Sequence, residues 1–349
     1  MPLETATTLI DRPPILVDLA LQGGGAHGAF TWGVLDRLLE EPWLEIDGVS
    51  GTSAGAMNAA VMADGYARGG ALCAREALDS FWRAVAHAGR FSPLRRGPLD
   101  RLLGRWTLDS SPMFIAMDMM SRLFSPYDVN PRGTNPLRDI LEEQIDFTRL
   151  RNSSVRLFIT ATNVHTGRGH IFRNADVTAD VLLASACLPT MFQAIEIDGE
   201  PYWDGGYSGN PTITPLVREC RSEDTILVQI NPVERKTTPR SAAEILNRLN
   251  EIAFNSVLLK ELRMGALLRR MADAKDEEGR LWAQMRIHRI SSDVMNELGA
   301  SSKLNAEWAF FEMLHREGRK SADVFLQAHA HDLGVRSTLE LDPQLEAKI

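Results

Sequence analysis

Residues 51–55 are Gly-Thr-Ser-Ala-Gly, and Ser53 at their centre is the side chain in this sequence best placed for covalent chemistry. The apolar residues 46–49 lead into the motif, and a helical pattern of small residues follows it. This G-x-S-x-G spacing is typical of a nucleophile elbow, in which a serine lies on a tight turn between a strand and a helix. Gly51 and Gly55 would supply the room that such a turn needs. A strand–turn–helix junction with an ordinary serine has the same pattern, so the motif alone leaves two interpretations open.

A glycine-rich turn at residues 23–28, Gly-Gly-Gly-Ala-His-Gly, offers a second set of chemical groups. It lies between a predicted strand and a predicted helix, where backbone N–H groups can bind an anion. Gly23, Gly25 and Gly28 formally fit the G-x-G-x-x-G spacing of a dinucleotide-binding turn, with Asp47 as the acidic residue about twenty positions further on. The alternative is an oxyanion hole for acyl transfer. The serine motif after the next strand favours the oxyanion hole.

Asp204, followed by Gly205 and Gly206, is a candidate base for the serine. A serine hydroxyl is a weak nucleophile until a neighbouring group takes its proton. A carboxylate within hydrogen-bonding reach can do this in a site that excludes water. The two glycines would let the chain turn sharply and bring the carboxylate close. Backbone donors would then stabilise the oxyanion by about 3 kcal/mol each.

The segments that carry these motifs alternate between strands and helices. Residues 15–21 and 46–50 are apolar runs typical of buried strands, and a helix with one apolar face is predicted over 28–40. A βαβ unit of this kind favours parallel strands. The sequence therefore predicts an α/β fold with a central, mainly parallel sheet flanked by helices in three layers. Further strands are predicted at 155–162, 169–172, 195–197, 225–230 and 285–290.

No linker-like change of composition divides the chain, so we expect one domain over residues 14–335. Residues 1–13 are expected to form an N-terminal leader, and residues 336–349 a poorly ordered tail. Inserted helices at about 72–146 and a helical extension at about 241–335 are expected to elaborate the domain.

The helical extension carries clear start signals. Residues 241–244, Ser-Ala-Ala-Glu, match a capping box and predict a long helix to about Met271. Two further helices are predicted over 303–316 and 321–332, with Ser321 as the N-cap of the second.

Residues 113–124 predict a helix that is apolar almost all round and holds four of the thirteen methionines. Ser111 and Pro112 provide its N-cap and first position. Such a helix is either buried or meets lipid some of the time, and methionine adapts its shape to irregular partners. The pattern favours a core helix, and a mobile lid or acyl-chain wall is the alternative. The basic residues of the preceding loop, 89–109, are interpreted as a solvated surface.

Composition and charge exclude several classes of protein. The chain has 349 residues and a net charge of −8, which gives no general case for nucleic-acid binding. Three widely spaced cysteines, Cys73, Cys187 and Cys220, indicate a reducing compartment and neither a disulfide framework nor a zinc site. The N-terminus does not resemble a signal peptide, and no apolar run is long enough for a membrane span. We therefore expect a cytoplasmic protein, peripheral to a membrane at most, that needs no metal or cofactor.

Taken in order, three motifs resemble those of the patatin-like phospholipase family, in the form of the bacterial patatin-like acyl hydrolases. They lie at residues 23–28, 51–55 and 204–206. The segment 184–192, Ala-Ser-Ala-Cys-Leu-Pro-Thr-Met-Phe, and the Asn-Pro pair after the aspartate are similar too. The resemblance covers roughly residues 15–231, about two-thirds of the chain.

The resemblance implies a catalytic dyad in which Ser53 is the nucleophile and Asp204 takes its proton directly. It also implies an oxyanion hole in the turn Gly23–Gly25, with Gly24 and Gly25 as the main N–H donors and Ala54 as a further one. The remaining glycines of the motifs would support these turns: Gly28, Gly51, Gly55, Gly205 and Gly206.

His27 departs from the family pattern, which usually has Arg or Lys at this place. One interpretation is a structural residue that hydrogen-bonds near the loop, and this one is preferred. The other is a modulator whose charge acts near the oxyanion and changes near neutral pH.

An α/β-hydrolase with a Ser…Asp…His triad is a second fold to consider. The serine follows what is predicted to be only the second strand, which is early for that fold. The late histidines that would complete the triad can all be explained as strand or helix-surface residues: His288, His315, His329 and His331.

The resemblance implies a serine lipid acyl hydrolase of the phospholipase A or lysophospholipase type, with a lipid or acyl ester as substrate and contact with a lipid surface. The same dyad would also serve a thioester or a storage polyester. A third hypothesis is a non-catalytic lipid-binding protein, against which the intact Ser53, Asp204 and glycine turn argue. No nucleic-acid partner is expected, and the oligomeric state is left open.

Overall fold

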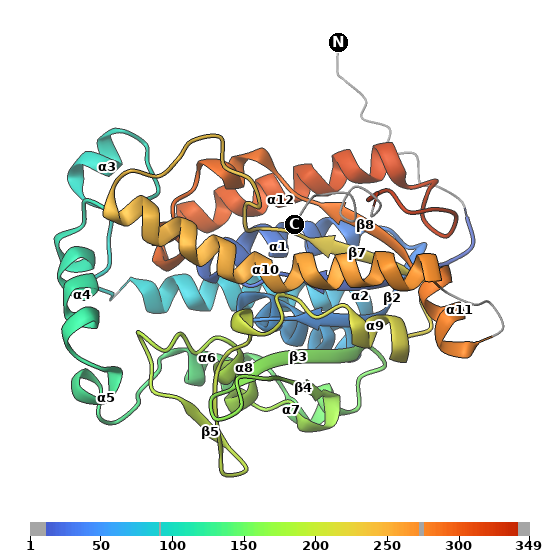
Figure 1. Ribbon diagram of the computed structural model, residues 1–349, viewed down its shortest axis with the longest axis horizontal. Coiled ribbons are helices and arrows are strands. Elements are labelled where there is room, and N and C mark those ends of the chain that lie inside the picture. The colour runs from blue at the N-terminus through green and yellow to red at the C-terminus, as the bar shows by residue number, and fades with distance from the viewer. Residues whose placement is uncertain (1–11, 91, 272–275, 341–349) are drawn as a thin grey trace.

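The computed structural model describes residues 12–90, 92–271 and 276–340. The predicted leader, residues 1–13, and the predicted tail, residues 336–349, lie largely outside this part of the chain. Figure 1 shows a central sheet with helices on both of its faces, which is the predicted α/β fold.

The sheet orders its strands as β5-β6-β3-β2-β1-β7-β8, with β4 pairing along β3. Strands β1, β2, β3, β7 and β8 pair in parallel, whereas β4 and β6 run antiparallel to β3, and β5 runs antiparallel to β6. Their bounds are β1 Ile15–Leu21, β2 Leu44–Gly51, β3 Arg156–Asn163, β4 Gly169–Arg173, β5 Ile195–Ile197, β6 Glu200–Asp204, β7 Asp224–Val228 and β8 Arg286–Ile290.

The helices follow most of the predicted ranges. Ser241 and Glu244 form the predicted capping box, in which the Glu244 N–H donates to Ser241 Oγ at 3.2 Å and the Ser241 N–H donates to Glu244 Oε2 at 3.1 Å. The α-helices are α1 Gly28–Leu38, α2 Ala54–Gly89, α3 Pro98–Leu102, α4 Pro112–Leu123, α5 Pro126–Val129, α6 Leu137–Gln144, α7 Phe147–Arg151, α8 Ala179–Ser185, α9 Thr214–Glu219, α10 Ala242–Met271, α11 Glu277–Gln284 and α12 Trp308–His329. Short 3₁₀ helices are η1 Gly25–His27, η2 Asn174–Asp176, η3 Gly205–Tyr207, η4 Asp293–Glu297 and η5 Ala300–Leu304.

Strands β1 and β2 are neighbouring parallel strands, as the βαβ pattern predicts. Leu19 pairs with Val49, and Leu21 pairs with Gly51. Because parallel strands end at the same edge of a sheet, the glycine turn after β1 and the serine motif after β2 lie side by side.

Alternate side chains of the inner strands face opposite helical layers, because successive side chains of a strand point to opposite sides of the sheet. In β1, Leu19 and Leu21 belong to the core that contains α1, α2 and α12, whereas Ala20 belongs to the core that contains α9, α10 and α11. Strand β3 repeats the pattern with Leu157 and Phe158. The sheet therefore lies between two apolar cores, which gives the predicted three layers.

Helix α2 begins directly after Ser53 and has a kink at Gly69 and Gly70, whose backbone angles are not helical. Its first part is the small-residue helix predicted after the serine motif, and it is buried almost throughout. Its second part is the helix predicted over residues 72–88. The glycine kink joins the two predicted helices into one element.

Helix α12 is one helix where two were predicted, and Ser321 lies inside it rather than at an N-cap. The prediction is wrong because Gly318 does not break the helix. A β-carbon at Gly318 would lie 2.1 Å from the Phe30 carbonyl oxygen of α1, and one at Gly33 would lie 2.0 Å from the carbonyl oxygen of His315. The two glycines let α1 and α12 approach backbone to backbone.

Helix α4 is the predicted Met-rich helix, but it is not part of the core. None of its residues is buried, and Met119 and Leu123 are 60% and 74% exposed. The favoured interpretation as a core helix is therefore wrong. The reason is its position: with α3 and α5 it lies at one end of the molecule, at the left of Figure 1, where neither the sheet nor a helical layer surrounds it.

Candidate active site

Ser53 lies on a sharp turn between β2 and α2. Its backbone angles, φ 54° and ψ −122°, are unusual for a residue other than glycine. A β-carbon at Gly55 would lie only 2.2 Å from the Leu21 carbonyl oxygen, and one at Gly51 would lie 2.6 Å from that of Gly55. Close backbone packing therefore requires both glycines of the motif, and it holds Ser53 in a strained conformation.

The glycine turn after β1 packs directly against the serine motif. A β-carbon at Gly23 would lie 2.7 Å from the β-carbon of Ser53, and one at Gly28 would lie 2.7 Å from that of Ala54. Gly25 has φ 57°, a conformation that other residues rarely adopt. These contacts bring the predicted oxyanion turn and the predicted nucleophile together.

Polar side chains fix the peptide groups of this turn. The Gly23 N–H donates to Asn210 Oδ1 at 2.7 Å, and Asn231 Nδ2 donates to the Gly23 carbonyl oxygen at 2.7 Å. Gln22 Oε1 accepts from the N–H groups of Ile230 and Asn231, at 3.0 and 2.9 Å. The Gly23 N–H, one of the expected oxyanion donors, is thereby engaged in holding the turn.

Asp204 ends β6 and is 2% exposed. Its carboxylate accepts a hydrogen bond from the Gly206 N–H at 2.7 Å. Burial raises the pKa of Asp204 to about 7, while this hydrogen bond, the nearby Ser53 hydroxyl and the positive charge of Lys303 oppose the rise. The carboxyl group can therefore exchange a proton near neutral pH.

Gly205 and Gly206 place Asp204 by close packing. A β-carbon at Gly205 would lie 2.0 Å from the Thr160 carbonyl oxygen, and one at Gly206 would lie 1.9 Å from the ring of Phe254. At both positions, where the chain leaves β6, a larger residue would meet neighbouring atoms.

Ser185 supports the backbone of Ser53, and sequence reasoning did not single it out. Its hydroxyl accepts from the Ser53 N–H at 2.9 Å and donates to the Thr160 carbonyl oxygen at 2.7 Å. In the sequence, Ser185 lies in the segment 184–192. This segment resembles the family, but the resemblance gives Ser185 no role.

Lys303 reaches the site from η5, and no motif points to it. Its ammonium group donates to Asn231 Oδ1 at 2.7 Å and lies 5.9 Å from the centre of the Phe254 ring. Burial lowers the pKa of Lys303 to about 8, against the negative charges of Glu251 and Asp204, which raise it. A lysine so far along the chain joins the site only through the fold.

His27 follows the glycine turn and is buried. Its Nε2 lies 2.8 Å from Ser302 Oγ, and its ring meets that of Phe310 edge-on at 6.1 Å. Burial, together with the positive charges of Lys303 and Arg235, lowers the pKa of His27 well below its ordinary value. The ring is neutral at physiological pH, which favours the structural interpretation over that of a charged modulator.

The late histidines of the alternative triad are engaged elsewhere or exposed. Within the described residues, no hydrogen bond or ion pair joins them to Ser53 or Asp204. The pairs are His288 with Asp224 at 3.0 Å, His315 with Asp36 at 3.0 Å and His329 with Asp332 at 2.9 Å, whereas His331 is exposed.

Asp47, the acidic residue of the formal dinucleotide pattern, forms ion pairs with Arg221 at 2.8 Å and with Arg156 at 3.4 Å. It also forms a cluster with Asp18 and Cys220, in which one ligand atom from each residue lies within 4.8 Å of the others. Burial raises the pKa of Asp18 to about 8, so this carboxyl is mostly protonated at neutral pH. Because two arginines already balance Asp47, the cluster does not favour a further cation.

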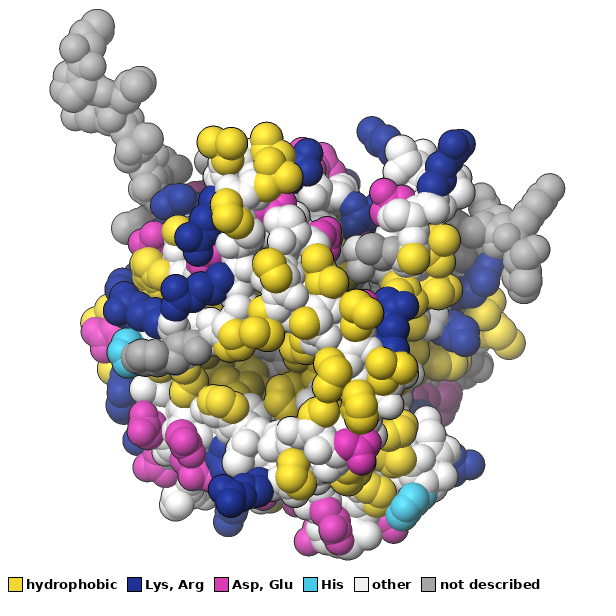
Figure 2. Space-filling view, turned by 90° about the vertical axis from the view of Figure 1, so that its left-hand side faces the viewer, with side chains coloured by type: hydrophobic (Ala, Val, Ile, Leu, Met, Phe, Trp, Pro, Cys, Tyr) yellow, Lys and Arg dark blue, Asp and Glu magenta, His cyan; other side chains and the backbone are white. Residues whose placement is uncertain are grey.

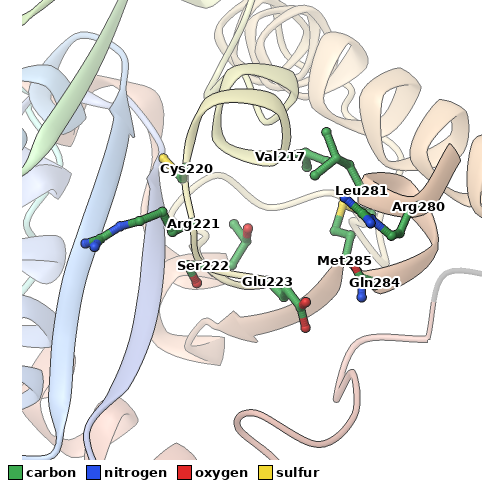
Figure 3. A pocket seen from close by; sticks show the side chains of 10 residues that line it. Val217, Cys220, Arg221, Ser222, Glu223, Arg280, Leu281, Gln284 and Met285 are labelled. Atoms are coloured by element: carbon green, nitrogen blue, oxygen red, sulfur yellow. The ribbon is translucent and has the colours of Figure 1, made fainter. Parts of the chain in front are cut away.

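A pocket of about 310 Å³ opens beside this cluster, and Figure 3 shows Arg221 and Cys220 on one side of it and Leu281 and Met285 on the other. It lies at the amino ends of β7 and β8, whereas Ser53 follows the carboxyl end of the parallel strand β2. The pocket is therefore at the opposite edge of the sheet from the serine. Its lining is Val217, Cys220, Arg221, Ser222, Glu223, Thr225, Arg280, Leu281, Gln284 and Met285.

The end of the molecule that carries α3, α4 and α5 is rich in exposed apolar side chains, and we call it the apolar end. Figure 2 shows hydrophobic side chains gathered there around a hollow. No helix within 12–90, 92–271 and 276–340 has both the length and the apolar character needed to cross a bilayer. The residues of the apolar end are Leu99, Leu102, Leu103, Met113, Ile115, Met119, Met120, Leu123, Phe124, Tyr127 and Val129.

Comparisons with known proteins place these features in a family. A model of the patatin-like phospholipases matches residues 19–217, which include the glycine turn, the serine motif and Asp204. Among solved structures, the crystal structure of VipD from Legionella pneumophila is similar, with 16% sequence identity, a TM-score of 0.39, and coverage of 91% of this chain and 67% of that chain. A search of curated proteins gave no match. Because the family model spans more than half of the chain, this protein belongs to the patatin-like phospholipase family.

Proposed function

We propose that this protein is a serine lipid acyl hydrolase in which Ser53 is the nucleophile and Asp204 the general base. The family to which it belongs implies the hydrolysis of lipid acyl esters. The observation that carries the assignment of residues is the pair itself: a serine on a strained elbow, and beside it a carboxyl whose pKa burial raises to about 7 and the serine hydroxyl helps to lower. A base whose pKa matches the working pH can both take and return a proton.

In the proposed acylation step, Asp204 takes the hydroxyl proton of Ser53 while Ser53 Oγ forms a bond to the ester carbonyl carbon. The tetrahedral intermediate then collapses, the bond to the leaving alcohol breaks, and Asp204 returns the proton to the alcohol oxygen. In deacylation, Asp204 takes a proton from water as the water oxygen attacks the acyl-serine. The proton returns to Ser53 when the free acid leaves.

The backbone N–H groups of Gly24, Gly25 and Ala54 are the proposed oxyanion donors. Ala54 begins α2, where N–H groups have no carbonyl partner one turn earlier and the helix dipole is positive. Gly23 has a different role in this proposal, since its N–H already donates to Asn210 and its lack of a side chain lets the turn touch the serine. Each free donor would contribute about 3 kcal/mol to the transition state.

The exposed side chains of the apolar end support a lipid surface as the place where the protein meets its substrate. A helix that is apolar almost all round and lies outside the core calls for a partner other than the core, and α4 exposes Met119 and Leu123 to solvent. Arg101 and Arg105 are exposed close by in the chain, and each would contribute about 1 kcal/mol at an anionic surface. In this proposal the apolar end rests on the lipid, and α4 borders the acyl chain as a lid or wall.

We would test the proposal by measuring hydrolysis of two kinds of substrate. The first is a series of nitrophenyl esters from acetate to palmitate, and the second is phospholipid and lysophospholipid vesicles. We expect turnover by the wild type, with a preference for long chains, and none by Ser53→Ala. An acyl thioester and a storage polyester assayed beside them decide between substrate classes. Equal rates for the two proteins, or no turnover of any ester by folded wild type, would refute the catalytic function and leave the lipid-binding alternative.

A further inference from the structure

We propose that Lys303 is a positioning residue of this site: it braces the oxyanion turn, and its positive charge favours the ionised form of Asp204. This inference rests on the proposed function, because it concerns the same reaction. Lys303 lies outside residues 19–217, which the family model matches, so family membership gives it no role.

Lys303 contacts one end of the oxyanion turn directly and is linked to the other end through Asn231. A β-carbon at Gly25 would lie 2.5 Å from the carbonyl oxygen of Lys303 and 3.4 Å from its β-carbon. At the other end of the side chain, the ammonium group donates to Asn231 Oδ1 at 2.7 Å. Asn231 continues the link, since its Nδ2 donates to the carbonyl oxygen of Gly23 at 2.7 Å. The backbone and the ammonium group of one residue thus hold both ends of the glycine turn.

The charges around Lys303 come from four elements. Glu251 on α10 and Asp204 at the end of β6 raise the pKa of Lys303. Arg235, after β7, lowers it. His27 on η1 is neutral. Glu251 is already paired with Arg235, with Oε2 and Nε 3.2 Å apart. In the described part of the chain, no carboxylate lies within ion-pair distance of the Lys303 ammonium group.

Phe254 links Lys303 to Asp204. Its ring lies 5.9 Å from the ammonium group and packs on Gly206, whose N–H donates to Asp204. The positive charge of Lys303 lowers the pKa of Asp204.

This positive charge matters because the proposed reaction moves a negative charge without removing it. The charge lies on Asp204 before attack and on the oxyanion beside Gly25 after the proton has moved. A fixed positive charge close to both positions favours the ionised base first and the oxyanion afterwards. Partial burial strengthens the effect, since charges interact more strongly away from water. His27, which is neutral, does not supply this charge.

The test separates the charge of Lys303 from its hydrogen bond. In Lys303→Gln the amide can still donate to Asn231 but the charge is lost, whereas Lys303→Arg keeps the charge. We would measure kcat and KM on a soluble nitrophenyl ester from pH 5 to pH 10. Without the cation the pKa of Asp204 rises, so in Lys303→Gln the acid limb of the pH–rate profile should move up by about one pH unit. At pH 7 this corresponds to about a fivefold loss of kcat, with little change in KM.

Lys303→Arg provides an independent measurement that does not require the neutral variant to fold. Since Lys303 has a pKa of about 8, the wild-type rate should fall above this pH as the ammonium group loses its proton. Arginine stays charged over this range. The alkaline fall should therefore disappear in Lys303→Arg, while the acid limb stays in place.

Lys260→Met is the matched control, because Lys260 is an exposed lysine on α10 and should change neither limb. An acid limb unmoved in Lys303→Gln, or an alkaline limb retained in Lys303→Arg, would overturn the proposal. Ser53→Ala separates the two levels of inference. If Ser53→Ala remains active, the proposed function fails; if it is inactive while both Lys303 variants keep the wild-type profile, only the role of Lys303 fails.

Discussion

The proposed catalytic corner, which comprises residues 22–28, 51–55 and 204–206, contrasts with the apolar end of the molecule. In the corner, glycine backbones touch neighbouring backbones, and Asp204 is 2% exposed. In the apolar end, α4 has no buried residue at all. The corner is held at fixed distances, as proton transfer and oxyanion binding require, whereas the other region leaves flexible side chains free to adapt to a partner.

The two regions are nevertheless joined through aromatic contacts. Trp106, between α3 and α4, stacks on Phe310 at 5.1 Å, and Phe310 meets the ring of His27. Tyr127, in the apolar end, accepts a hydrogen bond at 3.3 Å from the N–H of Ala194, which directly precedes β5. Changes in the two regions can therefore be compared in one protein: those of Ser53 and Asp204 in the corner should stop the chemistry, and those in the apolar end should change access to it.

The largest effect is expected from the dyad. Ser53→Ala and Asp204→Asn should each lower kcat by about 10⁴-fold, and the double variant should lose little more, because the two residues act as one unit. Circular dichroism and the melting temperature should show an intact fold. Near-normal kcat in Asp204→Asn would contradict the assignment of the base.

The pH profile tests the corner without mutation. Asp204 must be ionised to accept a proton, and burial raises its pKa to about 7. The value of kcat/KM should therefore rise with pH and reach half of its maximum near pH 7. At pH 5 it should be about a hundredfold below that of the fully ionised base, since each pH unit below the pKa costs a factor of ten. A profile that stays flat from pH 5 to pH 8 would show that a different group takes the proton.

Replacing Met117 and Met120 of α4 by glutamate tests the apolar end. Because α4 is not buried, the melting temperature should change little. Each methionine that contacts an acyl chain contributes about 1.5–3 kcal/mol, so hydrolysis of long-chain esters should fall by about tenfold or more while that of acetate esters is kept. Equal losses on both substrates, together with strong destabilisation, would end the idea of a lid or acyl wall.

The smallest effect is expected at the junction of the two regions, in His27→Ala. The neutral ring makes a hydrogen bond to Ser302 and packs on Phe310, so its loss should lower kcat by only a few-fold, about what one hydrogen bond contributes. The acid limb of the pH profile should stay in place. Abolished activity in a folded His27→Ala protein would instead show a direct catalytic role.

The shape of the proposed catalytic corner could largely be predicted from the sequence because its geometry is local. A turn as tight as that of Ser53 tolerates only glycine at positions 51 and 55, so the residue types reveal the conformation. The helix of residues 112–123 was also predictable, but its exposure was not. An apolar pattern shows which faces avoid water, and it does not show whether the fold brings a partner to cover them.

By itself the sequence determined the strand–turn–helix unit around Ser53, the glycine turn before it and the aspartate with two glycines after it, since each depends on neighbours within a few residues. Only the tertiary structure decided that Ser185 and Lys303 join this site and that α12 runs unbroken past Ser321. Those outcomes depend on the order of strands in the sheet and on the close approach of α1 and α12. Contacts between residues far apart in the chain leave no pattern in the sequence around either partner, so they become visible only when the chain is folded.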